Sequence, residues 1–182
     1  MKQELKEVLA AFAASILETY DLSFIPTDPK FLDATATAKR LGGAAVIYEY
    51  SMEVSVCRNK DSFIVYMPEE KEKHQQAKRM AEAAAILFFE MGYTANTEKF
   101  EKLKEMEKVT RKTGKDEASY EGICFLEHEL MLPEYRLKDL IKKYADDKQC
   151  LRISDLSREL GFPYNFIEMR LIETGMIKSR WD

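Results

Sequence analysis

The chain has 182 residues, of which 46% are hydrophobic and 33% charged, and this composition fits one globular domain, or one domain with a small appendage. A formal net charge of -4 excludes a bulk basic field that would draw the chain onto nucleic acid. Three widely spaced cysteines without a CxxC pair exclude a disulfide framework, and no segment reaches the roughly 20 apolar residues of a membrane span.

The N-terminal segment has the periodicity of a helix. Apolar residues recur at spacings of three and four over residues 5–20, which predicts an amphipathic helix. Acidic residues run through this stretch, so it is interpreted as a structural helix of a cytoplasmic protein and not as a signal peptide. A second helix is expected over residues 31–41, because Gly42 and Gly43 follow it.

A three-stranded sheet is expected next. The polar segment 58–61 separates two apolar runs, as a hairpin turn would. The runs rich in β-branched and aromatic residues that predict the strands are 45–50, 52–57 and 62–67.

The second half of the sequence is mostly helical. Pro68 predicts the start of a long helix that ends at Gly92. Segment 94–117 is strongly charged and is predicted to be a solvated helix or an excursion without chemistry. Further helices are expected over 120–132 and 136–144.

The C-terminal part is predicted to be a helix-turn-helix-like unit. Two short helical patterns meet at Gly161 and Pro163, which provide a tight turn. We therefore divide the chain into a main domain, residues 1–150, and a unit packed on it, residues 151–182. Asn165, Glu168, Arg170, Lys178 and Arg180 are its candidate DNA contacts, but the basic residues are few and the apolar ones too many to expose. We expect packing, and not direct nucleic-acid binding.

Three segments, in this order, resemble the ImmA/IrrE family of zinc metallopeptidases. Residues 74–85 follow a strand, where that family has its HExxH helix. Residues 120–133 resemble a segment with a metal-binding Glu before a Phe and a closing Pro. Residues 153–177 resemble a closing pattern of Arg, Leu, Gly and Ile. The resemblance implies an α+β, zincin-like peptidase domain with a three-stranded sheet, an active-site helix and a C-terminal helix-turn-helix-like unit.

The HExxH motif itself reads Ala81-Glu82-Ala83-Ala84-Ala85. In such a motif two histidines one turn apart bind zinc, and the Glu is the general base that activates the metal-bound water. The resemblance gives Glu82 the general-base position and Glu121 the third-ligand position. Ala81 and Ala85 stand where the histidines would be and have no donor atom, so zinc is expected only if both were His.

Two explanations of the missing histidines stay open. The chain is a natural pseudoenzyme, or it is a substituted variant of an active HEAAH protein. The same run is also simply a good helix former, since alanine has the highest helix propensity. A separate candidate metal cluster is Glu121, Cys124 and His128, which share a helix face but are more simply read as surface and core residues. His74 is expected to be exposed.

The resemblance also implies partners. Members of this family act on helix-turn-helix repressors, including those that silence mobile genetic elements. A chain that keeps the cleft without the metal is predicted to bind such a protein in the groove beside Glu82 and Glu121 without cutting it. The alternatives are an active zinc endopeptidase whose histidines were replaced, and a small DNA-binding transcriptional regulator.

Overall fold

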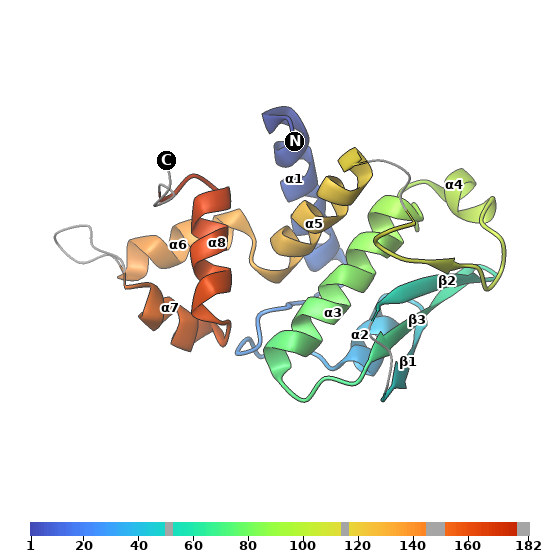
Figure 1. Cartoon of the computed structure of the whole chain (residues 1–182), viewed down its shortest axis with the longest axis horizontal. Helices are drawn as coiled ribbons and strands as arrows, with labels where there is room; N and C mark the ends of the chain where they lie inside the picture. The colour runs from blue at the N-terminus through green and yellow to red at the C-terminus, as the bar shows by residue number, and fades with distance from the viewer. Residues whose placement is uncertain (50–52, 114–116, 145–151, 178–182) are drawn as a thin grey trace.

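A computed structural model describes residues 1–49, 53–113, 117–144 and 152–177 (Figure 1). Within these ranges the fold is α+β, with eight α-helices and a four-stranded mixed sheet. The predicted α+β class is therefore confirmed, and the predicted strand count of three is one too low. In the described residues no helix is long and apolar enough to cross a membrane.

Two helices precede the sheet. Helix α1 (Gln3–Thr19) buries one stripe, and α2 (Ala34–Arg40) is capped by Asp33, whose carboxylate accepts a hydrogen bond from the Ala36 amide at 2.7 Å. The cap makes α2 start three residues later than the apolar pattern predicts. The residues of α1 that lie in the core are Leu9, Ala13, Ile16 and Leu17.

The sheet has the strand order β1-β3-β2-β4. Strand β1 (Ala44–Tyr48) runs parallel to β3 (Ser62–Pro68), and β2 (Ser55–Asn59) is antiparallel to both β3 and β4 (Lys108–Val109). The predicted hairpin turn joins β2 to β3, with Lys60 in the left-handed region at φ 56. The predicted strand ends at Tyr50 and Met52 lie outside the described residues.

Helix α3 (Lys73–Ala85) follows the sheet and continues into one π-helical segment, η1 (Ile86–Glu90). The predicted start at Pro68 is wrong, because Pro68 ends β3 and pairs with Tyr48 across the ladder. Four residues of loop separate it from α3. Figure 1 shows α3 lying across one face of the sheet, with α5 on its other side.

The charged segment is partly regular. It contains the short helix α4 (Thr97–Glu101) and then β4, whose Val109 pairs with Val56 and is buried. The chain returns to the core in α5 (Glu117–Met131), which packs against both α3 and α1. The segment is therefore part of the sheet, and not only a solvated excursion.

The C-terminal helices are α6 (Glu134–Tyr144), α7 (Ile153–Leu160) and α8 (Tyr164–Glu173). Gly161 ends α7 with φ 71, a conformation that glycine adopts without strain. The turn lies against the N-terminal loop, where Thr27 Oγ1 donates a hydrogen bond to the Glu159 carbonyl at 2.7 Å. Leu156, Ile167 and Leu171 belong to the same apolar core as the sheet and α3.

Candidate functional site

The alanine-rich stretch of α3 lies inside the protein. Ala81 and Ala85 have no exposed surface, and Glu82 between them is only 5% exposed. Helix α5 packs along this face of α3. A buried carboxylate needs a partner, because an isolated charge in the interior is costly.

The main partner from outside α3 is Arg111, which follows β4. Its Nη2 lies 3.3 Å from Glu82 Oε2 and also forms an ion pair with Glu127 of α5. On the other side, Arg79 joins Glu82 at 3.8 Å and Glu70 at 2.9 Å. Segment 94–117, in which no site residue was expected, thus supplies Arg111 to a row of alternating charges that runs Glu70, Arg79, Glu82, Arg111, Glu127.

Arg111 also contacts a thiol and an aromatic ring of α5. Its Nη1 lies 3.7 Å from Cys124 Sγ, and its guanidinium carbon is 6.0 Å from the centre of the Tyr120 ring. Its Nε is buried without a hydrogen-bond partner among the described residues. The guanidinium thus fills the space between α3 and α5, and one of its donors remains unsatisfied.

Burial dominates the electrostatics of the two carboxylates. It raises the pKa of Glu82 above its ordinary value, although Arg111 and Arg79 act to lower it. Burial likewise raises the pKa of Glu127 to about 7, opposed by Arg111 and reinforced by Glu82. Burial alone would lower the pKa of Arg111, but the Glu127 and Glu82 carboxylates raise it above its usual range. Arg111 therefore stays charged.

These residues do not fit a zinc ion. The two positions that would carry histidine present buried methyl groups, and a catalytic zinc needs three protein ligands. Among the described residues, no three His, Cys, Asp or Glu side chains are placed to hold a metal. Glu121, which the resemblance makes the third ligand, is about half exposed and forms an ion pair with the α-amine of Met1 at 3.1 Å.

The alternative cluster on α5 is divided among separate partners. Glu121 pairs with the Met1 amine, Cys124 meets Arg111, and His128 Nδ1 lies 3.1 Å from Glu173. His74 is half-buried and not exposed as expected, with its Nε2 3.1 Å from the Gln75 amide nitrogen. The simpler interpretation holds for Glu121, which is exposed, and for His128, which is half-buried, whereas Cys124 is half-buried and not in the core.

A second buried network holds α8 in place. Arg170 has no exposed surface, pairs with Glu129 at 2.6 Å and Glu173 at 2.5 Å, and donates to the Leu132 carbonyl. Buried in this way, Arg170 is not available as the DNA contact it was considered for. Lys178 and Arg180, the other basic candidates, lie outside the described residues. Arg170 instead fixes the C-terminal unit to the α5–α6 corner.

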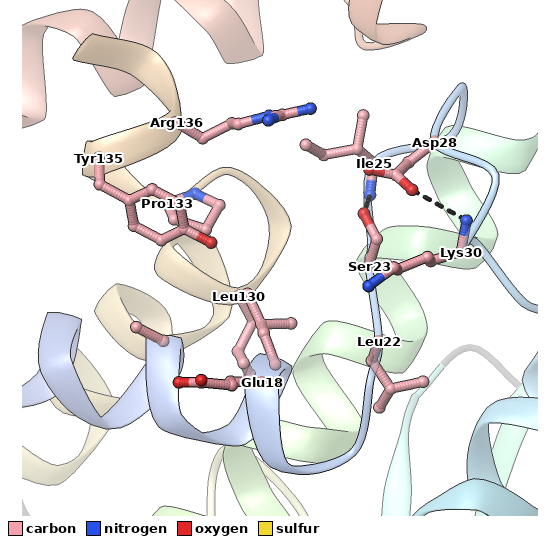
Figure 2. Close-up of a pocket in the computed structure, with 12 residues that line it drawn as sticks. Glu18, Leu22, Ser23, Ile25, Asp28, Lys30, Leu130, Pro133, Tyr135 and Arg136 are labelled. Atoms are coloured by element: carbon pink, nitrogen blue, oxygen red, sulfur yellow. Dashed lines mark hydrogen bonds between the residues drawn. The ribbon is translucent and has the colours of Figure 1, made fainter. Parts of the chain in front are cut away.

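Two cavities are relevant to binding. A cavity of about 250 Å³ lies between α3, α5 and α8, and Glu127 forms part of its wall. A second one, of about 530 Å³, lies between α1, the loop after it and the α5–α6 corner (Figure 2). No predicted site residue lines the second cavity.

Sequence reasoning placed Glu82 in the site but missed Arg111 and Glu127. One signal for Glu127 is its position on α5 beside the buried stripe of Ile123, Leu126 and Leu130. Comparisons with protein-family models, with curated proteins and with solved structures found no match to this chain.

Proposed function

We propose that this chain is a metal-free protein of the ImmA/IrrE, zincin-like type that binds a segment of a regulatory protein and does not cleave it. A helix-turn-helix repressor is the partner class that the resemblance implies. The observation that carries the proposal is the pairing of Glu82 with Arg111 beside two buried alanines.

The architecture supports a peptidase-type frame. The helix with the motif follows the last strand of the β2–β3 hairpin, and the second helix, α5, which carries Glu121, packs against it. The helix-turn-helix-like unit then closes the chain. These are the parts that the resemblance implies, in the same order along the sequence.

The charges argue against hydrolysis. A general base must accept a proton from water, but Glu82 Oε2 already faces Arg111 and Arg79. Without histidine at 81 and 85, the described residues provide no set of ligands for a metal that would activate water or polarise a carbonyl. Recognition of a protein segment is the part of the activity that remains.

The two alternatives have less support. In an active enzyme whose histidines were replaced, an arginine paired with the general base would obstruct the metal, so Arg111 favours natural loss. DNA binding through α8 would need its basic side chain at the surface, but Arg170 is fully buried. The protein-binding proposal needs neither a metal nor an exposed basic helix.

The test uses purified wild-type protein and purified helix-turn-helix repressors from the same genome, with zinc added. We expect calorimetry to detect a complex, and electrophoresis to show the repressor intact after incubation. The variant Glu82→Gln should behave like the wild type in the cleavage assay. Cleavage that Glu82→Gln abolishes, or no binding to any repressor in the panel, would overturn the proposal.

A further inference from the structure

The cavity between α3, α5 and α8 has a mixed lining, in which methionine, phenylalanine and proline side chains form the apolar part and polar or charged side chains the rest. Met131 and Phe162 are almost fully buried in its walls, and Met169 is 37% exposed. The Phe162 and Phe166 rings lie 4.8 Å apart. Methionine and aromatic side chains suit varied apolar ligands, and about 250 Å³ is enough for a large side chain.

One charged side chain on the rim of this cavity forms no ion pair among the described residues, and it is a lysine. Lys78 lines the cavity, is exposed, and has no ion pair or hydrogen bond among the described residues. The neighbouring carboxylates are already paired: Glu127 with Arg111, and Glu173 with both Arg170 and His128. The Lys78 ammonium acts electrostatically on Glu82 and Glu127 without forming an ion pair with either, so an anionic group that enters beside it can still form a direct contact.

This cavity adjoins the ion-pair site. His74, Lys78 and Glu82 are spaced four residues apart and lie on one face of α3. Glu127 belongs to both places, since it lines the cavity and binds Arg111. An extended segment that lies along α3 would reach the cavity at one end and Arg111 at the other.

We propose that this cavity is the anchor site for the protein partner: it takes a large apolar side chain, while an adjacent carboxylate of the same segment pairs with Lys78. The inference rests on the proposed binding of a protein segment, and it names the chemistry of that segment. The cavity in Figure 2 is a poorer anchor for such a segment, because charged residues of both signs line it: Glu18, Asp28, Lys30 and Arg136.

The probe is a synthetic peptide, acetyl-Ala-Phe-Glu-Ala-amide, titrated into ¹⁵N-labelled full-length protein and followed by NMR. Matched peptides carry Gln for Glu, or Ala for Phe. We expect the first peptide to shift the amides around Met131 and Phe166, with a dissociation constant of about 1 mM. The Gln peptide should bind about two- to fivefold more weakly, and the Ala peptide should not bind measurably.

The variant Lys78→Gln should remove the preference for Glu over Gln, whereas Lys39→Gln, which changes an exposed lysine of α2, should keep it. Equal affinity of the Glu and Gln peptides, shifts only around Arg136, or no shifts at all would overturn the anchor site. Failure of the proposed function has a different signature, since zinc-dependent cleavage of a repressor by the wild type would overturn it whatever the peptides do.

Discussion

Replacing Arg111 by methionine is the sharpest test of the ion-pair row. The substitution leaves Glu82 and Glu127, which are 5% and 1% exposed, without their shared guanidinium. Breaking a fully buried ion pair costs about 3–5 kcal/mol, and losing the unsatisfied Nε donor returns about 1 kcal/mol. Because the Arg111 side chain keeps 20% exposure, we expect a net loss of about 2–3 kcal/mol in the free energy of unfolding at about pH 8.

The loss should depend on pH in a defined direction. The pKa of Glu127 is raised from 4.5 to about 7 in the folded protein, so its protonated form favours folding and this advantage disappears as the pH rises through about 7. Removing Arg111 raises the pKa of Glu127 further. At about pH 5.5 the carboxyl is neutral in the folded state, and the cost of Arg111→Met should fall to about 1 kcal/mol.

Urea unfolding followed by far-UV circular dichroism measures both values. The neighbouring variant Lys112→Met is the matched control, because Lys112 is 81% exposed in its ion pair with Glu53 and should matter little at either pH. In the Glu127→Gln background, Arg111→Met should cost clearly less than in the wild type. An equal loss at both pH values, or no loss at about pH 8, would refute the reasoning.

Three further predictions concern the same helices. Glu127→Gln should make the free energy of unfolding depend less on pH, because the stability of the wild type falls between about pH 4.5 and 7 as this carboxyl ionises. Urea unfolding of both proteins at several pH values across that range measures the difference. The resemblance implies that Ala81→His/Ala85→His would bind zinc, but because Arg111 pairs with Glu82 beside both positions we instead expect no zinc uptake, together with a lower melting temperature from overpacking; zinc uptake by elemental analysis would contradict this. Arg170→Met should cost about 3–5 kcal/mol in urea unfolding, and Arg170→Lys should not recover it; a neutral effect would show that the network is dispensable.

Much of the fold follows from local patterns. The strands and the 58–61 turn were identified because β-branched runs and a polar interruption are local signals. Strand β4 was missed, since it has two residues and lies in a highly charged segment. The start at Pro68 is wrong because proline, although favoured at the first helical position, is also tolerated at the edge of a strand, and only the pairing with Tyr48 decides between the two.

The site was less accessible to sequence reasoning. Glu82 follows from the motif, but Arg111 is 29 positions away in a segment whose charges all look solvated. Its role depends on β4 joining the sheet, which directs the chain back towards α3 and α5. The resemblance places Glu121 at the third-ligand position, whereas in the fold its partner is the Met1 amine.

The most direct test of the central claim is the zinc content of the wild-type protein after incubation with zinc and removal of the excess, measured by elemental analysis. The account predicts no stoichiometric zinc, because Arg111 already occupies the space between Glu82 and Glu127 and the two neighbouring alanines offer no donor. A content of about one zinc per chain, lost together with Glu82→Gln or Glu127→Gln, would contradict it.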